Sequence, residues 1–255
     1  MRPEHPVALV TGASAGIGAA TARALAAEGF HLALGARRVA PIRDLAEELR
    51  RSRGVQVHAA SLDVRSTASV QEFVAGAVQA LGALHVVVNN AGLALGMDVM
   101  AAAPEASWRE MIDTNVEGVL RVTQAALPHL RAAGWGHVVF VGSVAGHGVY
   151  EGGSIYTATK HAVRALTDTL RLELCGEPIR VGTVDPGMVE TEFSVVRLGS
   201  RQKADGVYRG MTPLTGEDIA ECIRWMVMLP DHVNIDRIIV KPRDQAAFHK
   251  VHRRP

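Results

Sequence analysis

Three polar residues in the middle of the chain have the types and spacing that proton transfer requires. Tyr156 and Lys160 lie four residues apart, about one helical turn, so their side chains project from the same face of a helix, and Ser143 lies thirteen residues upstream of Tyr156. At roughly 6 Å and an effective dielectric constant of about 20, the ammonium group favours the phenolate by about 2.8 kcal/mol, or about two pKa units. We therefore expect Lys160 to lower the pKa of Tyr156 from its ordinary value of about 10 toward the range of acid–base catalysis.

Short apolar runs alternate with longer amphipathic stretches along the whole chain. The expected strands cover residues 7–10, 31–34, 55–59, 86–88, 137–141, 180–184 and 237–240, and the expected helices cover 16–28, 40–51, 66–81, 107–133, 154–175 and 215–229. Most strands are continuously apolar, as strands covered on both faces are. The alternation predicts an α/β fold with a doubly wound parallel sheet, in one domain of residues 1–255. Capping boxes are expected at Ser107 and Thr215.

The composition argues against several classes of protein. The 255 residues carry a net charge of +1, and only 4% are aromatic, so a nucleic-acid-binding surface is not expected. No apolar run reaches the length of a membrane span or of a signal-peptide core, so we expect a cytoplasmic protein. Cys175 and Cys222 lack metal-ligand spacing, and no metal site is expected. Surface or packing roles are expected for His147, His161, His232 and His249.

Residues 11–18 read Thr-Gly-Ala-Ser-Ala-Gly-Ile-Gly and join the first expected strand to the first expected helix. The glycines allow a tight turn and a close approach to a pyrophosphate, and the helix N-terminus offers N–H groups to phosphates. Ligands of such sheets bind beyond the carboxyl ends of the strands. The expected dinucleotide contacts in this loop are Gly12, Ser14, Gly16, Ile17 and Gly18.

The end of the second expected strand indicates which dinucleotide binds. An NAD site places a carboxylate there, whereas this chain has Arg37 and Arg38 and no acid. Arginine pairs with a 2′-phosphate that a carboxylate would repel. We therefore expect NADP, with Arg37 as the first choice for the phosphate; alternatively, both arginines simply lie in an exposed turn. Asp63, after the third strand, either accepts from the adenine amino group or forms a turn.

Several motifs occur in one order along the chain: Thr11-Gly-x-x-x-Gly-x-Gly18, Asn89-Asn-Ala-Gly92, Asn115, Ser143, Tyr156-x-x-x-Lys160 and Pro186-Gly187. Together they resemble the short-chain dehydrogenase/reductase family over essentially the whole chain. The resemblance implies a Rossmann domain with strand order 3-2-1-4-5-6-7 in a homodimer or homotetramer. Residues 191–197, 214–218 and 229–235 resemble the branch of NADP-dependent 3-hydroxy acid (serine) dehydrogenases.

The resemblance also implies a role for each candidate catalytic residue. Tyr156 would be the acid/base, Lys160 would lower its pKa and bind the nicotinamide ribose, and Ser143 would orient the substrate oxygen. Asn115 would hold a water that links Lys160 to solvent. Thr191 would bind the nicotinamide carboxamide or cap a short helix, and Asn90 would be structural. Further cofactor contacts are implied at Asn89, Ala91, Gly92, Pro186, Gly187 and Val189.

The substrate is expected to lie under residues 188–212, a polar, basic and turn-rich segment that we call the lid. Arg197 in the lid either recognises a substrate carboxylate or is a solvated surface charge. The favoured function is an NADP(H)-dependent oxidoreductase acting on a small 3-hydroxy acid or its carbonyl form. The alternatives are a reductase of a larger aldehyde or ketone and a non-catalytic NADPH-binding regulator.

Overall fold

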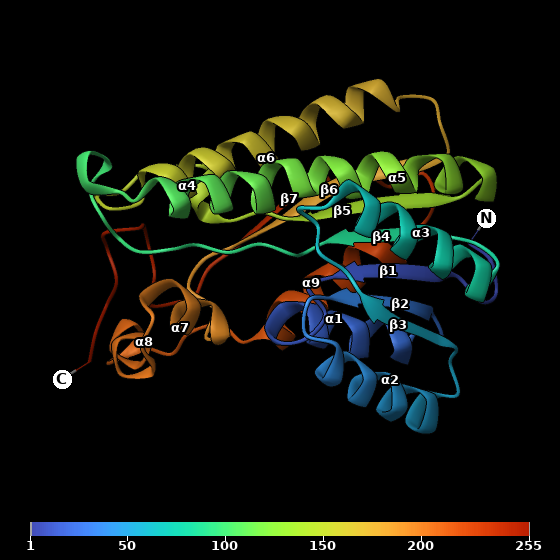
Figure 1. Ribbon diagram of the computed structural model, residues 1–255, viewed down its shortest axis with the longest axis horizontal. Helices are drawn as coiled ribbons and strands as arrows, with labels where there is room; N and C mark the ends of the chain where they lie inside the picture. The colour runs from blue at the N-terminus through green and yellow to red at the C-terminus, as the bar shows by residue number, and fades with distance from the viewer. Residues whose placement is uncertain (1, 255) are drawn as a thin grey trace.

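Residues 2–254, which the computed structural model describes, contain seven strands in one parallel sheet of order β3-β2-β1-β4-β5-β6-β7 (Figure 1). The predicted α/β fold class and strand order are confirmed. The strands are β1 (Val7–Thr11), β2 (His31–Ala36), β3 (Val57–Ser61), β4 (Val86–Asn89), β5 (Gly136–Val141), β6 (Ile179–Pro186) and β7 (Arg237–Val240).

Helices cover both faces of the sheet (Figure 1). One face carries α1 (Gly16–Ala27), α2 (Val39–Arg53) and α9 (Gly216–Met228), and the other carries α3 (Thr67–Leu81), α5 (Gly118–Ala133) and α6 (Ser154–Glu173). Successive residues of β1 point into opposite layers: Val10 packs in the core with Leu25, and Leu9 packs in the core with Phe73. Burial on both faces is the reason that the strands read as continuous apolar runs.

The helix expected over residues 107–133 has three parts. It consists of α4 (Glu105–Ile112), a π-helical turn η2 (Asp113–Glu117) and α5. Because α4 begins after Pro104, Ser107 lies inside its first turn, and the capping box predicted there is wrong. The capping box predicted at Thr215 is confirmed, with Thr215 Oγ1 accepting from Asp218 N–H.

The lid forms two short helices rather than a run of turns. They are α7 (Glu192–Leu198) and α8 (Arg201–Tyr208), and their N-caps are Thr191 and Ser200. Both lie beyond the carboxyl ends of the strands (Figure 1), where the C-terminal segment meets them as Arg254 N–H donates to Gly210 O. Two 3₁₀ turns, η1 (Met100–Ala102) and η3 (Val144–Gly146), also lie at this end. Within residues 2–254, no helix has the length and hydropathy to cross a membrane.

Candidate active site

The three residues singled out by spacing lie together at the carboxyl end of the sheet. Tyr156 and Lys160 occupy the first two turns of α6, and Lys160 Nζ lies 5.9 Å from the centroid of the Tyr156 ring. Ser143 is the N-cap of the 3₁₀ turn η3 after β5. Its Oγ accepts from Ala145 N–H at 3.1 Å, and its hydrogen bonding acts to lower the pKa of the Tyr156 phenol. The arrangement places a hydroxyl, a phenol and an ammonium group in one cleft.

The pKa of Tyr156 differs from the sequence-based expectation. Burial raises it to about 12, while hydrogen bonding to Ser143 and the charge of Arg197 oppose that rise. Burial also lowers the pKa of Lys160 to about 8, and Lys160 Nζ donates to Val141 O at 2.9 Å. The expected lowering of the Tyr156 pKa is not seen in this structure, because desolvation of the phenolate outweighs the effects of Ser143 and Arg197.

Asn115 lies in the π-helical turn between α4 and α5, a distortion that often occurs at functional sites. Its amide oxygen accepts from Leu93 N–H at 2.8 Å, and its amide nitrogen donates to Leu93 O at 2.7 Å and to Thr159 Oγ1 at 3.1 Å. The side chain therefore ties the segment after β4 to the helix that carries Lys160. The water that Asn115 is expected to hold stays a prediction.

The glycine-rich loop leaves the N-terminus of α1 open to a ligand. Ala15, at the N-cap, offers no side-chain hydrogen bond to the first turn, and Gly16 has φ +52°. A Cβ at Gly18 would lie 2.5 Å from Gly12 O, so the loop packs back on the helix only with glycine there. Such a cradle of backbone N–H groups fits a pyrophosphate.

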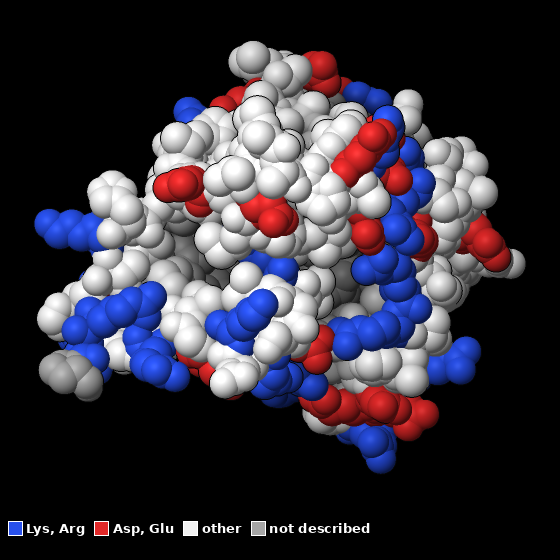
Figure 2. Space-filling model, turned by 60° about the vertical axis from the view of Figure 1, so that its left-hand side comes forward, with Lys and Arg blue, Asp and Glu red and all other residues white. Residues whose placement is uncertain are grey.

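Arg37 and Arg38 directly follow β2, and Figure 2 shows Lys and Arg side chains gathered in a column beside a hollow on one face of the molecule. Arg38 Nη2 donates to Ser14 Oγ at 3.2 Å and to Glu192 Oε2 at 2.7 Å, so it links the loop to the lid. Arg37 Nη1 lies 3.6 Å from Glu110 Oε1 of α4. These exposed cations beside the loop fit a 2′-phosphate. Glu192 was not singled out from the sequence, because only the fold brings the lid to Arg38.

Three predicted cofactor residues also have structural partners. Asp63 holds the guanidinium of Arg65 at 2.7 Å, and this hydrogen bond lowers the pKa of the Asp63 carboxyl. Asn89 Nδ2 donates to Thr123 Oγ1 at 3.0 Å in the buried contact with α5. Thr191 Oγ1 caps α7 by accepting from its second amide. The turn and cap roles are thus present, and contacts of these residues with the cofactor stay predictions.

The remaining predicted cofactor residues lie around the same end of the sheet. Ala91 N–H donates to Thr11 Oγ1 at 2.9 Å, and a Cβ at Gly92 would lie 3.8 Å from Lys160 Nζ. Val189 O accepts from the Tyr208 hydroxyl at 2.7 Å, which fixes the start of the lid. Pro186 ends β6, Gly187 N–H donates to Val240 O at 2.7 Å, and Ile17 is half-buried in α1.

Arg197 reaches from α7 into the cleft. Its guanidinium lies 5.4 Å from the ring centroids of both Tyr150 and Tyr156, and its Nε donates to Gly96 O at 3.2 Å. The Phe193 ring packs 5.7 Å from the Tyr156 ring. Arg197 and Tyr156 line one small cavity of about 20 Å³. Sequence reasoning missed Tyr150; its one signal was an aromatic residue close to Tyr156 in a chain with few aromatics.

Known proteins match the chain over nearly its full length. The family model for short chain dehydrogenases matches residues 6–199. A sulfoacetaldehyde reductase of Chromohalobacter salexigens is 45% identical over 94% of this chain and 95% of its own, and an NADP-dependent 3-hydroxy acid dehydrogenase of Salmonella typhi is 41% identical over 97% and 99%. A serine dehydrogenase structure with NADP⁺ has a TM-score of 0.87 and 38% identity over 97% of this chain and 100% of that one.

The fold, the site and these matches define the class of protein. The chain belongs to the short-chain dehydrogenase family, and it is an oxidoreductase. NADP, predicted from Arg37 and Arg38, is the cofactor named for the Salmonella relative and for the serine dehydrogenase structure.

Proposed function

We propose that this oxidoreductase interconverts a small 3-hydroxy acid and its carbonyl form, with NADP(H) as the cofactor. The observation that carries the proposal is the Arg197 guanidinium, 5.4 Å from the Tyr156 ring centroid at the same cavity. A substrate whose oxygen meets the Tyr156 hydroxyl can therefore place a nearby carboxylate against Arg197, which binds planar anions through two parallel hydrogen bonds.

The chemistry of the relatives' substrates supports an anion at this position. The matches include a 3-hydroxy acid dehydrogenase and a sulfoacetaldehyde reductase. In a 3-hydroxy acid the carbinol carbon is separated from the carboxylate by one carbon, and in sulfoacetaldehyde the carbonyl carbon is separated from the sulfonate by one carbon. The two substrate types thus present an anion at a similar distance from the reacting carbon.

Each side chain of the cleft has a different role in the proton transfer. The bound cofactor supplies or takes up the hydride. Tyr156 protonates the carbonyl oxygen in reduction and accepts the hydroxyl proton in oxidation, and Ser143 donates a hydrogen bond that orients that oxygen. With a pKa of about 8, Lys160 is mostly an ammonium at neutral pH, so it stabilises the phenolate that Tyr156 becomes after giving up its proton.

A second candidate is the reduction of a larger aldehyde or ketone. Leu95, Met111 and Ile155 line the cavity beside Tyr156. These apolar side chains favour a longer, less polar substrate. We expect a homodimer or homotetramer in the cytoplasm, with no nucleic-acid partner.

A substrate panel tests the choice between the two candidates. Purified protein is mixed with NADP⁺ and serine, 3-hydroxypropionate or 2-hydroxyethylsulfonate, with 1-propanol as the matched alcohol without an anion, and NADPH formation is followed. We expect turnover of the anionic alcohols and almost none of 1-propanol. Reduction of large neutral aldehydes by NADPH, without turnover of any anionic alcohol, would contradict the proposal and support the second candidate.

Arg197→Ala tests the anion contact directly. Loss of a charged hydrogen-bond partner should lower kcat/KM for the anionic alcohol about 10- to 100-fold, mainly through KM. Arg201→Ala, on the exposed first turn of α8, is the matched control and should leave kcat/KM near that of the wild type. An unchanged KM in Arg197→Ala would mean that Arg197 does not bind the substrate anion and is a solvated surface charge.

A further inference from the structure

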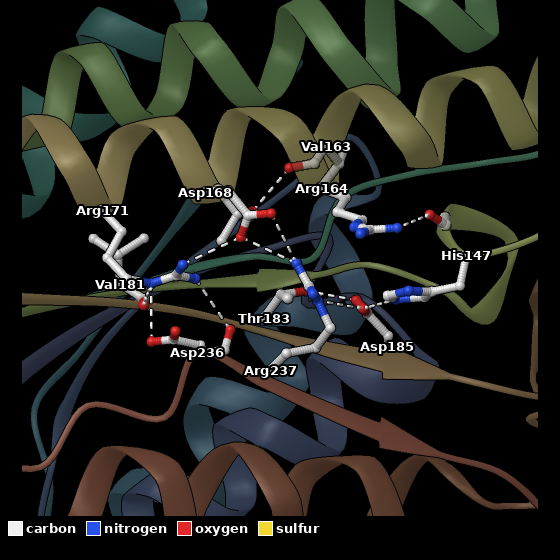
Figure 3. A network of polar contacts seen from close by, with 12 residues as sticks. His147, Val163, Arg164, Asp168, Arg171, Val181, Thr183, Asp185, Asp236 and Arg237 are labelled. Carbon is white, nitrogen blue, oxygen red and sulfur yellow. Dashed lines mark hydrogen bonds and ion pairs between the residues drawn. The ribbon is translucent and has the colours of Figure 1, made fainter.

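A buried carboxylate lies behind the catalytic cleft, at the next-to-last position of β6 (Figure 3). Asp185 is 2% exposed, and its Oδ2 atom lies 2.5 Å from His147 Nε2 and 3.4 Å from Arg237 Nε. Its Oδ1 atom accepts from Thr183 Oγ1 at 2.6 Å. A buried carboxylate is expensive unless partners satisfy it, and these three side chains supply them.

Asp185 contacts both ends of the segment that carries Ser143. Gly142 N–H donates to Val184 O at 2.8 Å, and a Cβ at Gly142 would lie 1.9 Å from Asp185 Oδ1. The carboxylate thus fills the space behind the residue before Ser143. His147, four residues after Ser143, binds the other oxygen of the same carboxylate. The Asp185 carboxylate therefore lies against the residue before Ser143 and against the residue four positions after it.

The same network reaches the helix that carries Tyr156 and Lys160 (Figure 3). Arg237 Nη2 donates to both carboxylate oxygens of Asp168 at 3.0 Å, and Asp168 lies on α6 two turns beyond Lys160. Arg164, also on α6, donates to Gly146 O at 3.4 Å. The end of β5, the end of β6, β7 and α6 are thus joined by charged contacts.

Lys160 is held beside the same segment, because Lys160 Nζ donates to Val141 O at 2.9 Å and Val141 directly precedes Gly142, against which the Asp185 carboxylate packs. Burial lowers the pKa of Lys160 to about 8, and the negative charge of Asp185 opposes this lowering. The groups that bear on the pair are Tyr156 on α6, Arg237 on β7 and His147 after β5. His147 and Arg237 hold Asp185 in place, and Asp185 in turn supplies the negative charge that faces a buried cation.

We propose that Asp185, clamped by His147, is a positioning residue of the reaction: it fixes the segment 142–147 so that Ser143 meets Tyr156, and it keeps Lys160 in its ammonium form. The part that concerns Ser143 rests on the proposed function. The part that concerns Lys160 does not depend on any substrate.

Protein labelled with [ε-¹³C]lysine tests the electrostatic part. The chain has four lysines, so four resonances are expected, and Lys160→Met identifies the one from Lys160. In Asp185→Asn the midpoint of the Lys160 titration should move to lower pH, because the opposing negative charge is gone. Asp244→Asn is the matched control, since Asp244 is also a buried acid and lies in the C-terminal segment. An unchanged Lys160 midpoint in Asp185→Asn would overturn this part.

Two variants at His147 test the positioning part. His147→Leu removes the donor to Asp185, whereas the amide nitrogen of His147→Gln can take the place of Nε2. We expect kcat to fall roughly tenfold or more in His147→Leu, with the NADPH Kd changed less than about twofold, and to recover in His147→Gln. Two results would show that the His147–Asp185 contact serves only packing. One is a wild-type kcat in His147→Leu. The other is that His147→Gln loses as much kcat and as much melting temperature as His147→Leu does.

The pH dependence of kcat connects the lysine titration with the test of catalysis. In Asp185→Asn the alkaline limb of kcat should move to lower pH together with the Lys160 resonance, and a limb that stays in place would contradict the proposal. If the wild type turns over no member of the substrate panel, the proposed function fails, while the lysine titration still decides the electrostatic part. Should Asp185→Asn fail to fold, the two His147 variants test the positioning part by themselves.

Discussion

At the scale of single residues, Lys160 is a buried cation that lowers the stability of the fold. It is 8% exposed, and burial lowers its pKa to about 8 from an ordinary 10.5. Between these two values the unfolded chain binds more protons than the folded one, so this group makes stability rise with pH. Below about pH 8 the full cost of burying the ammonium remains.

Lys160→Met should therefore stabilise the fold while it abolishes turnover. We expect the free energy of unfolding at pH 7 to rise by about 2 kcal/mol, and this gain to shrink as the pH rises from 8 toward 10.5. Urea unfolding at pH 7 and pH 10 measures it, with Lys203→Met on the exposed face of α8 as the control. A variant that is less stable than the wild type, or a gain independent of pH, would contradict the reasoning.

The sequence predicts which residues meet but not their electrostatic state. Helical spacing alone places Tyr156 and Lys160 on one face, and strand-end logic adds Ser143. The pKa of Tyr156 depends on burial among residues from distant segments, including Phe193 and Arg197 of the lid. Asp185 could have been noticed as an acid within an apolar strand, but its partners His147 and Arg237 come from other elements.

At the scale of elements, the lid is held at two sides of the cleft. Glu192 in the first turn of α7 pairs with Arg38, and Arg197 in the last turn bonds Gly96 after β4. The first of these contacts lies where a 2′-phosphate is expected, so the Glu192 carboxylate would compete with a bound 2′-phosphate for Arg38. Because both side chains are about half exposed, the pair itself contributes little to stability.

Glu192→Gln should tighten NADPH binding and leave NADH binding unchanged. Removing one negative charge beside the phosphate site should lower the NADPH Kd about two- to fivefold, as expected for an exposed charge pair. Fluorescence titration with both dinucleotides measures this, and Glu190→Gln, two residues earlier and also exposed, is the control. Weaker NADPH binding would instead mean that the pair closes over the bound cofactor.

Elements with a clear period were predicted well, and short or distorted ones were not. The strands and long helices follow from apolar runs and helical periodicity. α2 ends before Gly54, which has a left-handed conformation, and β3 begins at Val57 rather than at the expected Val55. The π-helical turn at Asn115 and the lid helices depend on contacts that no local pattern encodes. Thr191 and Ser200 are residue types that favour N-caps, but α7 and α8 are too short to be recognised from the periodicity of their apolar residues.

At the scale of the whole molecule, the layer of α5 and α6 leaves apolar side chains on the surface. Leu120 on α5 is 47% exposed and Leu172 on α6 is 79% exposed. Both helices cover the same face of the sheet (Figure 1), and the family resemblance implies that they pair across a two-fold axis. Apolar side chains that are exposed on one chain in this way are typical of surfaces that become buried in homodimer interfaces.

Leu172→Asp should lower the molecular mass of the oligomer measured in solution. A charge at this position cannot be buried in an apolar interface without a partner, so we expect the oligomer to dissociate or weaken markedly. Light scattering after gel filtration measures the mass, and Leu172→Met is the control that keeps an apolar side chain of similar volume. An unchanged mass in Leu172→Asp would exclude this surface as the interface.

Tyr156→Phe tests whether Tyr156 transfers the proton of the NADP(H)-dependent oxidoreduction. The variant keeps the ring that packs against Phe193 and loses only the hydroxyl. In one preparation we would measure kcat with the anionic alcohols and the Kd of NADPH by fluorescence. We expect kcat to fall at least about 100-fold while the NADPH Kd stays nearly unchanged. A variant that still turns over at a rate near that of the wild type would contradict it.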